Sequence, residues 1–316
     1  TLVMDIYRAG NACHREWIAF RKAHGGPLAT RSMAVNPLNR VINSIERRAF
    51  ERLRNSGGTI VVLSPLGREQ IRRHYDLDAD RFVVIPPVVD LKRLDVVGSL
   101  ARRDEHRKKL GIRDGSTALL HVGSGFRIKG LKNTIEALGL LTDNGLDYNL
   151  FVAGSDRKEA AGLKGLASRL GIIGRVHFLG GVKDLSGLYA ASDLFVVPSM
   201  FETFGVAAVE ALSFGLPVIV GRGAGAASFI EKEGAGRVID VPADPARFAA
   251  LIQETVEEEK QLRESGQMES VRKRRMNTAA ACARESVMEK YCALIDRAAR
   301  KASGKNIDKN RPKKIL

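Results

Sequence analysis

The sequence is poor in cysteine and has no long hydrophobic run. Three cysteines in 316 residues are too few for a disulfide framework. They fit a reducing compartment, so we expect a cytoplasmic protein. No stretch of about 18 apolar residues occurs, and we therefore predict no transmembrane helix.

The sequence also lacks the spacings that bind metal ions and the motifs that read nucleic acids. No cysteine or histidine has metal-ligand spacing. The Asp-x-Asp within Asp76–Asp80 separates a predicted helix from a predicted strand, and we interpret it as a turn. His121 and His177 lie in predicted strands and are assigned to the core. Because these spacings are missing, we expect no metal and no cofactor. Because the sequence has no recognition helix and no aromatic-rich sheet motif, we expect no nucleic-acid partner.

Positive charge is what the sequence has in excess. The formal net charge is +15 and the pI is near 10.0, which indicates an anionic partner such as a nucleotide-bearing substrate or an anionic membrane surface. Acidic residues lie between the basic ones, so a solvated helix face is the favoured interpretation of any single cluster. The clusters are Arg47, Arg48, Arg52 and Arg54; Arg72 and Arg73; Arg102, Arg103, Arg107, Lys108 and Lys109; and Arg272, Lys273, Arg274 and Arg275.

Short apolar strands alternate with helices from Ser116 onward. This alternation predicts parallel β-α-β units in a doubly wound α/β sheet. Ligands of such sheets bind at the carboxyl ends of the strands. The expected strands lie within residues 117–124, 148–155, 175–181, 193–199, 217–221 and 236–240.

The first 87 residues are interpreted as mixed helix and strand. Ser64 is a predicted N-cap, because Pro65 after it suits the first position of a helix. Residues 88–115 look like a linker with one charged helix. The elements expected before the linker are an amphipathic helix within 36–55, a buried strand within 59–64, a helix within 65–75 and a strand within 81–90.

A glycine-rich loop, GSGFRIKG, follows the predicted strand at 117–122. Gly123, Gly125 and Gly130 permit close backbone approach, and Arg127 and Lys129 supply cations at the carboxyl end of the strand. This combination suits a diphosphate. It matches neither a Walker A loop nor a dinucleotide-binding fingerprint, and a plain strand-to-helix turn remains an alternative.

A second loop, SMFETFGVAAVEAL, places two glutamates around a sharp turn. Gly205 allows the turn, after which the N–H groups of residues 203–206 point from a helix N-terminus, where anions bind. Glu202 precedes that helix and Glu210 lies within it. Eight residues turn by about 80° even in a continuous helix, so we expect the two carboxylates to contact different parts of one ligand.

Residues from about Ser116 to Asp240 resemble the donor-binding domain of glycosyltransferase family 4, which has the GT-B fold. The resemblance lies in HVGSGFRIKG, RVHFLGGVKDLSGLYAASDLFVVPS, ETFGVAAVEAL and GLPVIV, in that order. Upstream, MDIYRAGNACHREW, FERLRNSGGTIVVLSPLGREQIRRHY and RFVVIPPVVD look like the second half of an acceptor domain. Bacterial lipopolysaccharide core glucosyltransferases are the most similar members.

This resemblance implies a role for each residue of the two loops. Lys129, with Arg127 and Gly125, would bind the donor diphosphate, and Lys129 would stabilise the charge of the leaving group. Glu210 would bind the ribose, and Glu202 would contact the transferred sugar near its reacting carbon. The amides of Thr203, Phe204, Gly205 and Val206 would hold sugar and phosphate, and Gly180–Val182 would pass near the base.

The implied function is retaining transfer of a hexose from UDP- or GDP-hexose to a glycan or glycolipid acceptor such as a lipopolysaccharide core. Glu202 and Lys129 are the predicted catalytic residues, and an anionic membrane surface on the inner face of the cell membrane is a predicted partner. Two alternatives stay open. One is a nucleotide-sugar 2-epimerase on the same fold, and the other is a truncated remnant that binds nucleotide-sugar or glycolipid without catalysis.

The expected fold is therefore GT-B, with two Rossmann-like doubly wound α/β domains. We expect the first domain to be incomplete, because about 87 residues are fewer than the about 100–150 of a typical domain. The family's amino-terminal glycine-rich loop and first strands also have no counterpart. The expected units are an acceptor-side domain (1–87), a linker (88–115), a donor-binding domain (116–282), a C-terminal helix (283–302) and a disordered basic tail (303–316).

Overall fold

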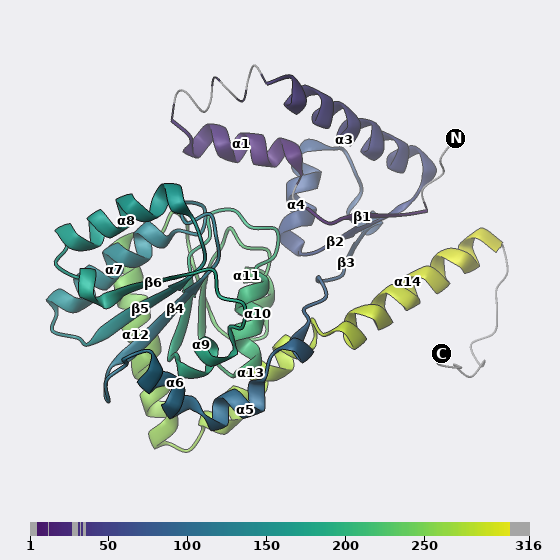
Figure 1. Ribbon diagram of the computed structural model, residues 1–316. Helices are drawn as coiled ribbons and strands as arrows, with labels where there is room; N and C mark the ends of the chain where they lie inside the picture. The colour runs from purple at the N-terminus through teal and green to yellow at the C-terminus, as the bar shows by residue number, and fades with distance from the viewer. Residues whose placement is uncertain (1–4, 12, 27–30, 32, 34–35, 304–316) are drawn as a thin grey trace.

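The computed structural model describes residues 5–11, 13–26, 31, 33 and 36–303. Two α/β domains stand side by side, a smaller one built from the first part of the chain and a larger central one (Figure 1). This confirms the predicted fold class. The predicted tail at 303–316 lies outside the described residues, apart from Ser303.

The central domain contains a six-stranded, wholly parallel sheet in the order β6-β5-β4-β7-β8-β9. Numbered within the sheet, this is the order 3-2-1-4-5-6 of dinucleotide-binding folds, in which ligands bind where the strand order reverses. That point lies between β4 and β7. The strands are β4 (Thr117–Val122), β5 (Tyr148–Ala153), β6 (Val176–Gly180), β7 (Leu194–Val197), β8 (Val218–Gly221) and β9 (Arg237–Ile239).

Helices cover both faces of this sheet, which explains why its strands are apolar on both sides. On β4, Leu120 and Val122 belong to one core, and Leu119 belongs to the other. The first core is closed by α9 (Ser186–Ala191), α10 (Val206–Ser213), α11 (Ala227–Lys232) and α13 (Met268–Ala280). The second is closed by α7 (Leu131–Asp143), α8 (Arg157–Arg169) and α12 (Pro245–Glu264).

The amino-terminal domain has a three-stranded parallel sheet in the described residues, ordered β1-β2-β3. The hydrophobic pattern does not single out β1, because it is a four-residue edge strand with Arg8 exposed. Ser64 is the N-cap, and its Oγ accepts a hydrogen bond from the Gly67 amide at 3.1 Å. The elements are β1 (Ile6–Ala9), α1 (His14–His24), α3 (Pro37–Ser56), β2 (Thr59–Val62), α4 (Pro65–His74) and β3 (Phe82–Val84).

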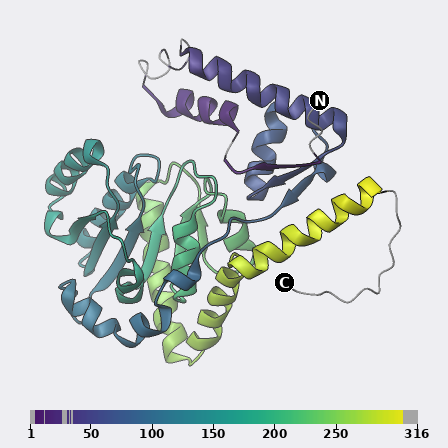
Figure 2. The same ribbon diagram turned by 45° about the vertical axis from the view of Figure 1, so that its right-hand side comes forward.

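The last helix, α14 (Arg284–Ser303), leaves the central domain and runs back along the amino-terminal sheet (Figures 1 and 2). Val287 and Leu294 on this helix pack against Val61 and Ile85, which lie in and just after the strands of that sheet. The end of the described chain therefore completes the core of the amino-terminal domain.

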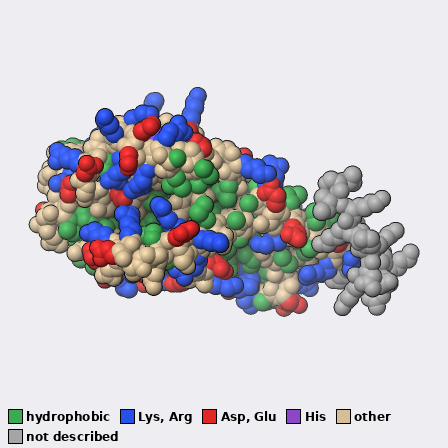
Figure 3. All heavy atoms as spheres, turned by 90° about the horizontal axis from the view of Figure 1, so that it is seen from below, with side chains coloured by type: hydrophobic (Ala, Val, Ile, Leu, Met, Phe, Trp, Pro, Cys, Tyr) green, Lys and Arg blue, Asp and Glu red, His purple; other side chains and the backbone are tan. Residues whose placement is uncertain are grey.

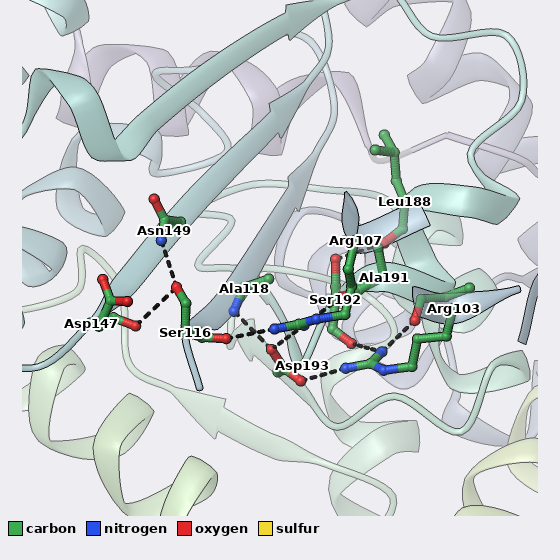
Figure 4. Close-up of polar contacts among 11 residues, drawn as sticks. Arg103, Arg107, Ser116, Ala118, Asp147, Asn149, Leu188, Ala191, Ser192 and Asp193 are labelled. Carbon is green, nitrogen blue, oxygen red and sulfur yellow. Dashed lines mark hydrogen bonds and ion pairs between the residues drawn. The ribbon is translucent and has the colours of Figure 1, made fainter. Parts of the chain in front are cut away.

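The segment between the domains contains two short helices, α5 (Val96–Ala101) and α6 (Arg103–Lys109), after the turn η2 (Leu91–Arg93). The sequence predicts only one helix here. Arg103 and Arg107 on α6 both donate to the Asp193 carboxylate, at 2.6 and 2.9 Å, and to carbonyls at the end of α9 (Figure 4). The Ala118 amide of β4 donates to the same carboxylate. This cluster fastens α6 to the amino ends of β4 and β7.

No helix within the described ranges has both the length and the apolar composition that crossing a bilayer requires.

Candidate active site

The two predicted loops meet at the switch point between β4 and β7. Gly130 has φ 73°, and a Cβ on it would lie 2.5 Å from the Pro198 carbonyl oxygen. The Met200 amide donates to the Ile128 carbonyl at 2.8 Å. A residue with a side chain at position 130 would therefore separate the loops, and glycine lets them share one cleft.

Lys129 and Glu202 form an ion pair across this cleft. Lys129 Nζ donates to Glu202 Oε1, and Ser199 Oγ donates to Oε2 at 3.0 Å. The side chains of the pair are 18% and 20% exposed. Sequence analysis selects both residues for catalysis, and the structure places them in direct contact. They line one narrow pocket with Val122, Val197, Gly205 and Ala226.

The loop that carries Glu202 is fixed to its neighbour by the backbone. The Glu202 amide donates to the Gly223 carbonyl at 2.9 Å, and the Gly225 amide donates to the Glu202 carbonyl at 3.1 Å. Gly205 then takes φ 107° and begins α10. Within the described part of the chain, the amides of residues 203–206 donate to no acceptor. They open α10 beside Lys129, and a helix N-terminus with free amides is a kind of site at which anions bind in proteins.

Glu210 is buried inside α10, and its carboxylate has other partners than that of Glu202. Only 3% of its side chain is exposed. Arg93 of η2 donates to Oε1 at 2.5 Å, and the Tyr189 hydroxyl donates to Oε2 at 2.9 Å. Burial, and then the Glu210 charge, raise the pKa of Tyr189. The hydrogen bond to Glu210 raises the pKa of Arg93.

Sequence reasoning misses Arg93 and Tyr189. The sequence does indicate that Glu210 has a partner, because a carboxylate in an apolar helix requires one. It does not identify which residue, however, because Arg93 lies 117 positions before Glu210.

The remaining residues of the first loop also lie at this edge. Arg127 is exposed and has no ion pair among the described residues. The Phe126 amide donates to Asp156 at 3.2 Å and so holds the loop in place. Gly180–Val182 lie at and just after the carboxyl end of β6, where the Gly154 amide donates to the Gly180 carbonyl.

His121 lies in β4 below Lys129 and is completely buried, as expected for a core residue. Neither ring nitrogen has a hydrogen-bond partner within the described residues. Burial, and then the charge of Lys129, lower the pKa of His121 to about 3. It is therefore neutral near pH 7. In the same part of the chain, no group of three or more His, Cys, Asp or Glu side chains could hold a metal ion.

Comparison with known proteins defines the class to which this fold and site belong. Residues 102–269, which include both loops, match the family model "Glycosyl transferases group 1". The chain belongs to this family. Its parallel sheets with helices match solved glycosyltransferases of the GT-B fold.

The lipopolysaccharide glucosyltransferase WaaG of Escherichia coli (strain K12) is one relative. It is 30% identical over 243 residues, which are 76% of this chain and 61% of WaaG. A crystal structure of WaaG matches with a TM-score of 0.67 and 27% identity, over 96% of this chain and 76% of that structure.

Two other matches cover less of the sequence or share the fold alone. The D-inositol 3-phosphate glycosyltransferase of Geodermatophilus obscurus is 32% identical over 58% of this chain and 42% of its own length. The structure of Anabaena Alr3699/HepE in complex with UDP-glucose has a TM-score of 0.64 at 18% identity, covering 95% of this chain and 79% of that one, and it shows a shared fold. By sequence, the chain spans less than two thirds of the length of WaaG and of the D-inositol 3-phosphate glycosyltransferase.

Proposed function

We propose that this chain is the donor-binding part of a retaining hexosyltransferase that uses a nucleotide-sugar. The observation that carries the proposal is the Lys129–Glu202 pair beside the unbonded amides of residues 203–206. A cation and a helix N-terminus can bind a diphosphate, and a neighbouring carboxylate can accept hydrogen bonds from sugar hydroxyls. Residues 116–282 would form the donor-binding domain and residues 88–115 the linker to the acceptor-side domain.

The donor would extend from Glu202 to Glu210. Its diphosphate would bind Lys129, Arg127 and the amides that open α10. Its hexose would face Glu202. Its ribose hydroxyls would donate to Glu210, because a carboxylate offers about four lone-pair sites and Arg93 and Tyr189 use two of them. The base would lie near Gly180–Val182.

Transfer would proceed on one face of the sugar. The bond between the anomeric carbon and the phosphate oxygen breaks, and the acceptor hydroxyl oxygen bonds to that carbon. The acceptor proton passes to the leaving phosphate oxygen, so Glu202 need not form a covalent intermediate. Lys129 and the helix amides stabilise the negative charge that develops on the diphosphate.

The acceptor that we propose is a lipopolysaccharide core glycan, at an anionic membrane surface on the cytoplasmic side. The named activity of WaaG supports the acceptor. The membrane part rests on α3, where Leu38, Val41 and Ile45 are exposed on one helical face that continues as Arg48 and Arg52. An apolar and basic face of this kind suits an anionic bilayer surface.

A transfer assay tests this function. Labelled UDP-glucose is incubated with the chain and with lipopolysaccharide whose core lacks its hexoses, and label in the glycan is counted. Transfer that Lys129→Ala abolishes supports the proposal. Donor binding without transfer, even in a longer version of the protein, would identify a binding remnant. Turnover of donor without acceptor would indicate an epimerase, which none of the named relatives favours.

A further inference from the structure

Three aromatic rings from two domains meet in front of the proposed donor site. Trp17 and Phe20 lie on α1 of the amino-terminal domain, and Phe201 lies in the loop after β7 of the central domain. The Phe201 centroid is 5.2 Å from that of Trp17 and 4.9 Å from that of Phe20. Both views show α1 lying over the central domain (Figures 1 and 2). These distances are those of directly packed rings.

The aromatic contact lies next to Glu202 in the sequence. Phe201 directly precedes Glu202, whose carboxylate is held by Lys129 and Ser199. The backbone on either side is bound to the central domain through the Met200 and Glu202 amides. The Phe201 side chain therefore makes the aromatic contact of this loop with the other domain.

The helix that supports Phe201 has little else to hold it on that side. α1 contains no fully buried residue, and Trp17, Phe20 and Phe201 are all half-buried. Arg21 lies over the Trp17 ring at 5.5 Å, a cation–π contact that orients the indole. Since α1 has no fully buried residue, the aromatic cluster fixes where this helix meets the loop.

We infer that Trp17 and Phe20 are positioning residues for Glu202. By supporting Phe201, they hold the Glu202 loop in the geometry that binds the transferred sugar, so approach of the two domains is coupled to sugar recognition. This inference rests on the proposed function of Glu202. Its effect should fall on the sugar and not on the nucleotide, since the ring contacts of Trp17 and Phe20 with the central domain are made to Phe201, next to Glu202.

Calorimetry with UDP and with UDP-glucose separates an effect on sugar recognition from an effect on nucleotide binding. Trp17→Ala and Phe20→Ala should leave UDP affinity within about twofold and weaken UDP-glucose several-fold, as Phe201→Ala should. Trp17→Phe keeps a ring and should recover most of the loss. Ile18→Ala is the matched control, because the next residue on a helix points about 100° away. Equal losses for both ligands, or an Ile18→Ala effect as large as that of Trp17→Ala, would overturn the inference.

Two further measurements do not depend on a ligand. Trp17 is the sole tryptophan of the chain, so Phe201→Ala should move the fluorescence emission to longer wavelength as the indole becomes exposed. Deuterium uptake by the peptide around Glu202 should be several-fold faster in Trp17→Ala than in wild type or Ile18→Ala. Unchanged uptake contradicts the inference. A further outcome is that uptake is faster in Trp17→Ala than in wild type while the wild type binds neither UDP nor UDP-glucose. In that case the proposed donor is wrong, but the positioning contact stands.

Discussion

At the scale of single residues, Glu202 and Glu210 differ in what surrounds them. Each accepts hydrogen bonds from one cation and one hydroxyl, Glu202 from Lys129 and Ser199 and Glu210 from Arg93 and Tyr189. The Glu202 side chain, however, is 20% exposed and lines the pocket, whereas that of Glu210 is 3% exposed. Two carboxylates in such different surroundings are suited to different groups of one ligand. The surroundings therefore favour a division of the donor between them.

This division predicts different mutant phenotypes. Glu210→Ala should weaken UDP and UDP-glucose equally, by about 1.5–3 kcal/mol for a lost charged hydrogen bond. Glu202→Ala should leave UDP affinity unchanged and remove the part that depends on the sugar. Calorimetric titration of each variant with each ligand makes the comparison. If Glu202→Ala weakens UDP as much as Glu210→Ala does, the two acids belong to one structural network instead.

The buried His121 should make the stability of the fold sensitive to acid. Burial lowers its pKa to about 3 in the folded protein, against 6.5 for an exposed histidine. Between these values the unfolded chain binds a proton that the native state does not, so stability falls as the pH is lowered through this window. One proton gives a limiting slope of about 1.4 kcal/mol per pH unit.

Urea unfolding from pH 6.5 to pH 4 measures this slope. His121→Leu removes the titrating ring, and stability should then depend less steeply on pH. Leu120→Val on the same strand changes packing without changing titration, and it should lower stability by a similar amount at every pH. A slope that His121→Leu leaves unaltered would place the acid sensitivity elsewhere.

At the scale of secondary-structure elements, the attachment of α6 depends on one carboxylate. Asp193 accepts hydrogen bonds from Arg103, Arg107 and the Ala118 amide. These side chains are 15–26% exposed. Asp193→Ala would leave two poorly solvated guanidinium groups without their counter-ion and the Ala118 amide without its acceptor.

We expect Asp193→Ala to lower the free energy of unfolding by about 3 kcal/mol, the scale for removing one partner of a buried ion pair. Lys132→Ala is the control, because Lys132 pairs with Glu136 on the surface of α7, where a pair contributes about 0.3–0.5 kcal/mol. Denaturant unfolding compares the two. Similar, small losses in both variants would show that α6 is held by packing alone.

At the scale of the whole molecule, sequence patterns predict what is local. The central sheet follows from alternating strands and helices, and the two loops follow from their glycines and glutamates. The pattern fails where the determinant is distant in sequence. Arg93 contacts Glu210 from 117 positions away, and Trp17 meets Phe201 only after both domains have folded. Neither contact leaves a periodic signal.

Charge is also a property of the whole molecule. Lys and Arg side chains are spread over the face seen from below, with Asp and Glu among them (Figure 3). On α3 the arrangement differs, because exposed Leu38, Val41 and Ile45 share a face with Arg48 and Arg52, neither of which has an ion pair among the described residues. This helix, and not the overall charge, is the proposed membrane contact.

Binding to vesicles of phosphatidylglycerol and phosphatidylcholine tests that contact. We expect binding that weakens with added salt, because the Debye length shortens from about 30 Å at 0.01 M to about 8 Å at 0.15 M. Arg48→Ala should remove about 1 kcal/mol of binding free energy and flatten the salt dependence. Ile45→Ser should weaken binding at every salt concentration, since it removes apolar burial. Ile295→Ser, on the exposed side of α14, should have no effect. Binding that is absent at low salt, or insensitive to salt, would exclude α3 as an electrostatic membrane anchor.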